Sequence, residues 1–393
     1  MRSRLRRCCG GGACEMGGGV EVAAESRVLE LYERFVGKRL LFIAGTLLLI
    51  VVLVGVAVTL GSANITVGQA YAAVVKATLE KLEAAVNAMM LGRLELHFAP
   101  DFDVPSKYEK IVCDIRLPRV FMALVVGAAL ALAGTVMQAI LRNPLASPFT
   151  IGISSAAGFG AALAIILGVS LTRSTIWIVA GNAFVFAVLD ALLIYGISRM
   201  KGATPETMIL AGVAFMYLWS GMTSFLQYVG EAHAVQEALI WMFGDLTRAT
   251  WLKLGVTSLI AAACIPYLVL KAWDLNVLML GDETAKSLGV DAGRVRLTSM
   301  LFASLLTAGA VCFVGTIGFV GLVAPHIVRM IIGGDHRFLL PASALFGAAL
   351  LLACDTAART VLAPVILPVG ILTSFMGVPL FLYLILRRRR EYW

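Results

Sequence analysis

The sequence predicts an all-α, polytopic membrane protein of about ten transmembrane helices. Hydrophobic residues make up 60% of the 393 residues and charged residues only 14%, whereas soluble domains have about 25% charged residues. Uncharged runs of about 20 residues recur along the chain, and a helix of that length spans the hydrocarbon layer. Lysine and arginine gather between these runs and at the chain ends, as they do in membrane proteins.

The net charge of +8 does not indicate a nucleic-acid partner. The basic residues lie between apolar runs, where they orient the spans in the lipid bilayer. The seven cysteines form neither a disulfide framework nor a zinc pattern. Cys264, Cys312 and Cys354 fall inside apolar runs, where cysteine behaves as a small hydrophobic residue. We therefore predict no metal site.

The clearest span lies within residues 116–148 and has no charge between residues 120 and 141. Gly127, Gly134 and several alanines lie inside it. Small residues matter in lipid, because helices associate there through close backbone packing rather than through a hydrophobic drive. We expect this span to pack against several others.

The first 115 residues divide into three parts. Residues 1–37 are predicted to form a cytoplasmic tail, disordered to about Glu21 because of its basic and glycine-rich composition. Residues 38–60 form the first transmembrane helix. Residues 61–115 form an extracytoplasmic insertion, in which residues 66–91 have the apolar spacing of an amphipathic helix and the rest is irregular.

Residues 116–390 are predicted to hold the other nine helices. The apolar runs that indicate them are 120–141, 151–169, 175–197, 208–229, 250–270, 295–314, the short 315–332, 339–361 and 370–386.

Residues 271–294 separate two spans but are too polar to be one, because Asp282, Glu283 and Lys286 interrupt the apolar pattern. We predict two short helices within residues 274–292, joined by an elbow at Gly281. Ordinary loops have about 4–6 residues. A segment of this length therefore indicates a structured surface for a partner.

The lysines and arginines of the short loops set the orientation. Arg142, Lys201 and Arg337 lie on the same predicted side as residues 271–294, and the other short loops hold few basic residues. We expect this side, with both chain ends, to be cytoplasmic in the plasma membrane. Residues 61–115 then face outward.

The sequence has no glycine-rich phosphate loop and no arrangement of catalytic residues, so we predict no enzyme activity of its own. Asp190 and Asp355 are acids near apolar spans, which are by default candidates for function. They leave open an ion-coupled secondary transporter. The competing interpretation is that each pairs with a neighbour, since Arg359 follows Asp355 by one helical turn.

Several long motifs follow one another in a recognisable order: RLPR at 116–119, GAALALAG at 127–134, RNPLASP at 142–148, LGDETAKSLGV at 280–290, GFVGLVAPHIVR at 318–329 and LPVGILTSFMGVPLFLYLI at 367–385. The chain resembles the FecCD-type permease subunits of ABC importers for iron chelates, haem and vitamin B12.

The resemblance implies a type II ABC importer permease-like fold that works as a homodimer. It implies two ABC ATPase subunits, which bind ATP and Mg, and an extracytoplasmic substrate-binding protein, while this chain binds no cofactor. The cargo it favours is an iron chelate of the siderophore type, with haem and cobalamin as alternatives.

The resemblance also assigns residues to three roles. Coupling to the ATPase falls to Leu280, Gly281, Asp282, Glu283, Ala285, Leu288 and Gly289. Docking of the binding protein falls to Arg116, Arg119 and Arg359, whose planar guanidinium groups suit carboxylates. The cytoplasmic gate falls to Thr204, Pro205 and Glu206, beside a pathway lined by residues 208–229.

Overall fold

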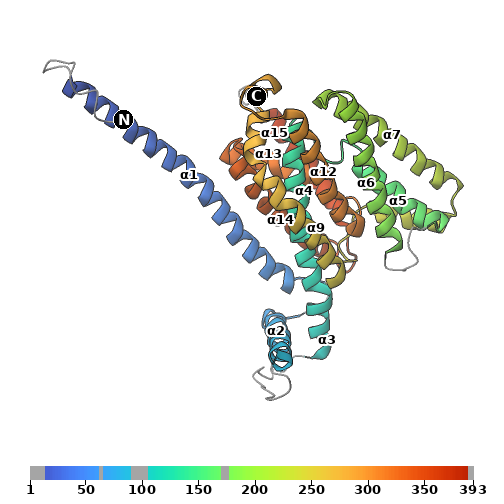
Figure 1. Ribbon diagram of the computed structural model, residues 1–393. Helices are drawn as coiled ribbons and strands as arrows, with labels where there is room; N and C mark the ends of the chain where they lie inside the picture. The colour runs from blue at the N-terminus through green and yellow to red at the C-terminus, as the bar shows by residue number, and fades with distance from the viewer. Residues whose placement is uncertain (1–13, 62–64, 90–104, 170–176, 388–393) are drawn as a thin grey trace. The chain divides into compact units, whose positions relative to one another are not determined.

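The computed structural model describes residues 14–61, 65–89, 105–169 and 177–387, which form helices and turns with no strand among them. Figure 1 shows their arrangement. The helices are α1 (Cys14–Thr59), α2 (Val67–Met89), α3 (Ser106–Lys110), the π-helical turn η1 (Ile111–Arg116), α4 (Leu117–Ile140), α5 (Ile153–Leu167), α6 (Ile178–Met200), α7 (Pro205–Val229), α8 (Ala232–Met242), α9 (Trp251–Leu270), α10 (Ala272–Leu278), α11 (Asp282–Ser287), α12 (Ala292–Val314), α13 (Val320–Ile332), α14 (His336–Thr360) and α15 (Val369–Arg387).

The described helices confirm the all-α membrane fold. Seven stretches are long and apolar enough to cross a membrane: Val36–Thr59, Ser106–Ile140, Ile178–Met200, Pro205–Val229, Trp251–Leu270, Ala292–Val314 and His336–Thr360. Three shorter apolar helices, Ile153–Leu167, Val320–Ile332 and Val369–Pro379, correspond to the remaining predicted spans. They are shorter than the roughly 20 residues that a full crossing needs.

Helix α4 is the centre of the bundle, as the sequence predicted. It packs against α9, α12, α13 and α14, and most of its side chains are buried. A Cβ atom on Gly134 would overlap the carbonyl group of Gly321 in α13, and one on Gly127 would overlap that of Gly347 in α14. Glycine at these crossings lets the backbones meet directly, which is how small residues join helices in lipid.

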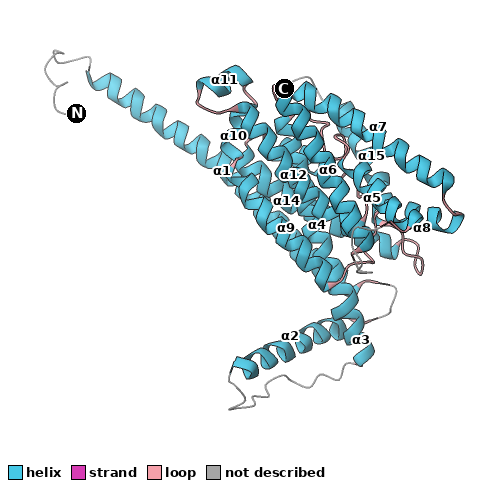
Figure 2. Cartoon of the chain, turned by 45° about the vertical axis from the view of Figure 1, so that its right-hand side comes forward, coloured by secondary structure: helices cyan, strands magenta, loops and turns pink. Residues whose placement is uncertain are grey.

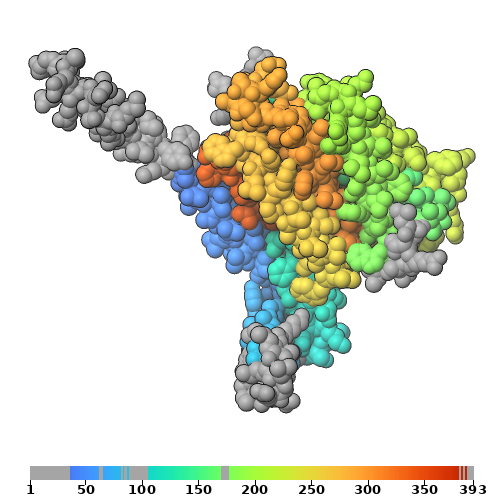
Figure 3. All heavy atoms as spheres, in the orientation of Figure 1, coloured from blue at the N-terminus to red at the C-terminus, as the bar shows by residue number. Residues whose placement is uncertain are grey.

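A second group of helices, α5, α6 and α7, is joined to α4 through α12, which packs against α5, α6 and α4. An aromatic cluster joins the three: Phe159 of α5 lies 5.0 Å from Phe186 of α6 and 5.5 Å from Trp219 of α7, measured between ring centroids. Helix α7 lies at the edge of the bundle, and Figure 3 shows its spheres in yellow-green along that edge.

Residues 1–45 and 46–393 form separate compact units. In the larger unit, hydrogen bonds join helix ends in two places. One place is near α10 and α11, and the other is near the end of α1. Figure 2 shows α11 and α2 at opposite ends of the bundle. The structure therefore separates the insertion from the elbow, as the sequence predicted.

The described helices extend beyond two predicted boundaries. Helical structure is continuous from Ser106 to Ile140, so the helix begins before residue 116, the predicted start of the permease core. A proline inside a helix removes one amide donor, and the π-helical turn Ile111–Arg116 lies directly before Pro118 in this continuous helix.

Residues 14–21 were expected to be disordered, but α1 begins at Cys14. No proline interrupts residues 14–59, and the good helix formers that follow outweigh the local cost of glycines 17–19. The amphipathic helix predicted over residues 66–91 is confirmed as α2, and residues 90 and 91 lie outside the described part of the chain.

The crossing at Gly134 gives a first prediction. Gly134→Ala should destabilise the protein by about 1–3 kcal/mol, because the added carbon overlaps a backbone carbonyl that cannot move alone. Thermal unfolding in detergent would measure the loss as a lower midpoint. Gly196→Ala is the matched control: nothing lies near its Cβ position, so alanine should be neutral or stabilise by up to about 1 kcal/mol. Equal midpoints for the two variants would contradict the prediction.

Candidate functional site

The segment after α9 forms the predicted elbow. Helix α10 ends at Leu278 and α11 begins at Asp282, with Gly281 between them at a φ of 114°. Gly289, which follows α11, has a φ of 80°. Residues with a side chain rarely adopt either angle, so glycine is needed at both bends. The two short helices and their glycine hinge are therefore confirmed.

The residues assigned to ATPase coupling divide between two faces of the elbow. Leu280 and Leu288 are 65% and 60% exposed, and Glu283 is exposed beside them. Ala285 is fully buried against the bundle. The elbow therefore exposes two large apolar side chains among its polar residues.

Helix α10 is fastened to the start of α14 through Asn276. The amide of Asn276 donates to Asp335 at 2.9 Å, and its oxygen accepts from the backbone N–H of His336 at 2.8 Å. Burial acts to raise the pKa of Asp335, but hydrogen bonds from Arg337 and Asn276 outweigh burial and hold this pKa well below its ordinary value. Arg337 also lies over the Trp273 ring, with its guanidinium carbon 4.2 Å from the ring centroid.

Helix α11 is fastened through Asp282, its first residue. Arg142 and Arg296 both donate to this carboxylate, and the Arg296 Nη2–Oδ1 distance is 2.8 Å. The hydrogen bond from Arg296, with the positive charges of Arg296 and Arg142, lowers the pKa of Asp282. The carboxylate therefore stays ionised at neutral pH, and the elbow is held by charge as well as by packing.

The predicted gate residues lie next to this anchor. Thr204 caps the start of α7, accepting from the backbone N–H of Thr207 at 3.3 Å, and Pro205 is the first helical residue. Glu206 is exposed. The carbonyl of Ala203, just before them, accepts a hydrogen bond from Arg296 at 2.7 Å. The Arg296 side chain thus links the predicted coupling residues to the turn that precedes the predicted gate residues.

Arg296 was not among the predicted site residues. The sequence did contain an indication of its role: it is an arginine one residue inside a predicted apolar span, and a charge there needs partners. Its exposed fraction is only 1%, the lowest of the basic residues near the elbow.

The opposite end of the bundle holds the three arginines assigned to docking. Arg119 donates to both oxygens of Asp355, at 2.9 and 3.1 Å. Arg359 lies 3.2 Å from the same carboxylate, one turn along α14. Asp355 is fully buried, so two positive charges enclose it without solvent.

Two of these arginines also donate hydrogen bonds to the last carbonyl groups of α1. Arg116 donates to the carbonyls of Val58 and Thr59, both at 2.8 Å. Arg359 donates to the carbonyl of Ala57 at 3.2 Å. Arg116, Arg119 and Arg359 are each only 4% exposed. They face inward in this structure, which the sequence indicated only for the pair of Arg359 with Asp355, and their docking role stays a prediction.

Asp190 also has a neighbour. Its Oδ1 accepts a 2.7 Å hydrogen bond from the indole N–H of Trp219, and its side chain is fully buried between α6 and α7. Both acids that suggested ion coupling are therefore engaged within the chain. For Asp355 and Arg359 this is the pairing that their spacing indicated.

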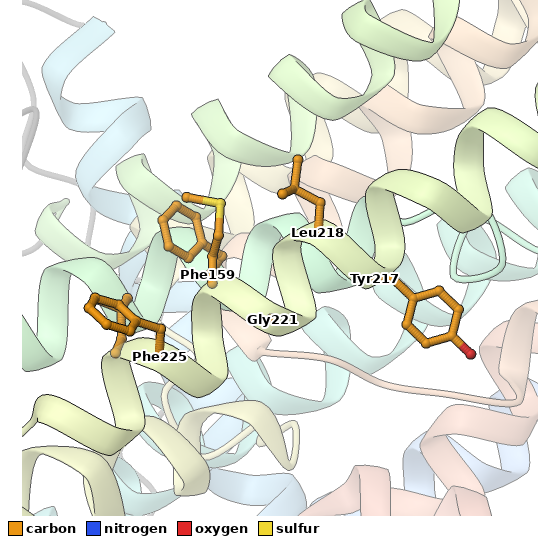
Figure 4. Close-up of a pocket in the computed structure, with 7 residues that line it drawn as sticks. Phe159, Tyr217, Leu218, Gly221 and Phe225 are labelled. Atoms are coloured by element: carbon orange, nitrogen blue, oxygen red, sulfur yellow. The ribbon is translucent and has the colours of Figure 1, made fainter.

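A hollow of about 540 Å³ runs along α7, the helix predicted to line the pathway. Figure 4 shows Tyr217, Leu218 and Phe225 standing off α7, with Phe159 from α5 beside them. A second hollow of about 660 Å³ lies between Phe243, Thr316 and α15. Both are lined chiefly by apolar and aromatic side chains, which suit a bulky organic molecule.

The comparison with known families decides the identity. Residues 47–387 match the FecCD transport family along their whole length. The chain belongs to the FecCD transport family.

Relatives of this FecCD-family chain include permeases named for different cargoes. It is 42% identical to a hemin transport system permease of Yersinia pestis, over 78% of this chain and 93% of the relative. It is also 42% identical to a cobalamin import system permease of Halobacterium salinarum, over 74% of this chain and 76% of the relative. Sequence identity therefore does not choose between these cargoes.

A solved structure of a metal-chelate type ABC transporter in an inward-facing conformation has a similar fold. Its TM-score is 0.72 at 30% identity, and the match covers 88% of this chain and 99% of that chain. The FecCD-family fold of this chain therefore extends over nearly all of that subunit.

The buried ion pairs around Asp355 give a second prediction. Asp355→Asn should destabilise the protein by about 3–5 kcal/mol, because it leaves Arg119 and Arg359 buried without a counter-charge. Denaturant unfolding in detergent would measure this loss.

Asp274→Asn is the matched control for this change. It removes the same charge from a pair with Lys271 that is about one-third exposed on both sides, so it should cost no more than about 1 kcal/mol. A similar loss of unfolding free energy in both variants would show that the buried pairs of Asp355 stabilise the protein no more than an exposed pair does.

Proposed function

We propose that this chain is the permease subunit of an ABC importer that moves a metal chelate into the cytoplasm, powered by separate ATPase subunits. The observation that carries the proposal is the elbow of α10 and α11, a rigidly anchored segment that presents two exposed leucines at one end of a FecCD-family bundle. An importer subunit without its own phosphate-binding loop would receive energy from an ATPase partner through such a surface.

The ATPase contact is proposed at Leu280, Glu283 and Leu288. A stable interface needs a desolvated apolar centre with polar residues around it, and the two leucines have that setting. The hydrogen bonds that anchor α10 and α11 would help this contact to transmit movement, because a rigid segment passes on a displacement that a flexible loop would not. ATP and Mg would be bound by the partner.

Orientation follows from the basic residues. The elbow end carries Arg142, Arg294, Arg337 and Lys271, and loops rich in lysine and arginine stay in the cytoplasm. We place this end and both termini in the cytoplasm, and the chain in the plasma membrane. The insertion and the three buried arginines then lie at the outer end, where the binding protein would dock.

A second copy of the chain is proposed to cover α7. Leu210, Tyr217, Phe225 and Tyr228 are 71%, 71%, 64% and 89% exposed. Such a row of large side chains on an edge helix fits an interface between copies, with the pathway along it. We assign the hollow beside Tyr217 to that pathway.

For the cargo we propose an iron chelate of the siderophore type, with haem and cobalamin as the other outcomes of the test. Aromatic and apolar side chains along α7 suit an organic complex better than a bare metal ion, whose ligands are charged or polar. Specificity would then come mainly from the binding protein that delivers the complex.

The alternative is an ion-coupled secondary transporter that uses Asp190 or Asp355. Asp355 lies between two arginines that compensate its charge, and Asp190 is held by Trp219. Asp355 therefore has a structural task. The second oxygen of Asp190 is buried without a hydrogen-bond partner among the described residues, so transport has to be measured to separate the two functions.

A transport assay separates the two functions and gives a third prediction. The chain is reconstituted in vesicles with the proposed ATPase and binding-protein subunits, and uptake of ferric siderophore, hemin or cobalamin is measured. We expect uptake that requires ATP and continues when an uncoupler removes the proton gradient, because the energy enters through the elbow.

Uptake without any ATPase subunit, or uptake that stops with the uncoupler, would overturn the proposed function. As a matched control, Asp190→Asn should leave the ATP requirement unchanged, whereas an ion-coupled carrier should lose transport with this acid.

A further inference from the structure

One guanidinium group joins three elements at the elbow end. Arg296, the fifth residue of α12, donates to the carbonyl of Ile140 at 2.9 Å and to the carbonyl of Ala203 at 2.7 Å. It also donates to both oxygens of Asp282, at 2.8 and 3.2 Å. The acceptors belong to the end of α4, the turn before α7 and the start of α11.

These partners differ in how firmly they are held. Ile140 belongs to α4, the buried centre of the bundle. Asp282 belongs to a helix of six residues on the elbow, and its side chain is 41% exposed. Arg296 itself is almost fully buried. Arg296 is thus bonded to the rigid helix α4 through Ile140. Through Asp282 it is bonded to the short helix α11, which would contact the proposed ATPase.

The turn before α7 is held in an unusual conformation. Ala203 has a φ of 53°, a left-handed value that costs a residue with a side chain about 1 kcal/mol or more. Its N–H donates to Ser198 at 2.7 Å and its carbonyl accepts from Arg296. The next residue, Thr204, caps α7. A change at Arg296 therefore acts on a strained turn that sets where α7 begins.

We propose that Arg296 is the residue that transmits movement of the elbow to the gate at the start of α7. This inference rests on the proposed function, in which an ATPase acts on α11. Displacement of α11 moves the Asp282 carboxylate, the guanidinium follows it, and the hydrogen bond to Ala203 is strained or released. Arg296 is a positioning residue and need not touch the cargo.

Arginine suits this role better than lysine. Its planar fork presents donors in several fixed directions, so one side chain can hold a carboxylate and two carbonyls together. A lysine ammonium is a compact point charge on a flexible stem. Arg296→Lys therefore keeps the positive charge but cannot hold all three elements in one geometry.

The test uses the complete importer reconstituted in vesicles with its ATPase and binding protein. Cargo uptake and ATP hydrolysis are measured together, and their ratio gives the coupling. We expect Arg296→Lys to assemble and hydrolyse ATP while the cargo moved per ATP falls at least about fivefold, a usual size for coupling between sites. Asp282→Asn should lower the same ratio.

Arg294→Lys is the matched control. Arg294 lies on the same helix two residues away, its side chain is 81% exposed, and its pairing is with Asp291 at the surface. We expect an unchanged ratio of cargo to ATP in this variant.

Two outcomes would overturn the inference: an unchanged ratio in Arg296→Lys and Asp282→Asn, or a loss of hydrolysis and uptake in equal proportion, which indicates a purely structural role. If Arg296→Lys fails to assemble, Asp282→Asn decides alone, because it leaves both carbonyl bonds of Arg296 in place. A wild-type importer without ATP-driven uptake would instead refute the proposed function.

Discussion

Helix ends inside a membrane protein leave carbonyl groups without partners, and in this chain buried arginines supply the missing donors. The last carbonyls of a helix have no amide hydrogen further along the chain to accept, and hydrocarbon offers no water to replace it. Arg116 and Arg359 satisfy the end of α1, and Arg296 satisfies the end of α4. The arrangement of the bundle depends on these contacts, because each one ties the end of one helix to the side of another.

Buried arginines need counter-charges, and the two ends of the bundle supply them differently. At the end where α1 finishes, the counter-charge is Asp355, fully buried between Arg119 and Arg359 in the body of α14. At the elbow end it is Asp282, partly exposed on a short helix. The positive charges at the first end are therefore neutralised inside the fold, while at the elbow end neutralisation depends on a partly exposed segment.

This difference bears on how the centre of the bundle can be rigid while α7 responds to the elbow in the proposed coupling. Glycine contacts along α4 hold α13 and α14 at close range, so the centre of the bundle does not deform easily. Helix α7, by contrast, is fastened by an aromatic cluster, by Trp219 with Asp190, and by the turn at Ala203. In the proposed coupling, loss of the Arg296 bond to Ala203 would release the start of α7.

The sequence by itself determined the membrane class, the apolar helices, the elbow at Gly281 and the family. These depend on local composition, on spacing along the chain and on motifs read in order, so one sequence contains them. It also indicated the pair of Asp355 with Arg359, because one helical turn separates them.

Only the tertiary structure decided what the buried arginines bond to. Arg296 is 93 residues from Ala203 and 156 from Ile140, and nothing local in the sequence indicates such contacts. The family resemblance assigned Arg116, Arg119 and Arg359 to docking, and that role stays a prediction. Their bonds to Asp355 and to the end of α1 could not be predicted from local sequence, because these partners come together only when the helices pack. The carbonyl that a guanidinium will find depends on how helices cross, and the crossing is settled by packing between distant parts of the chain.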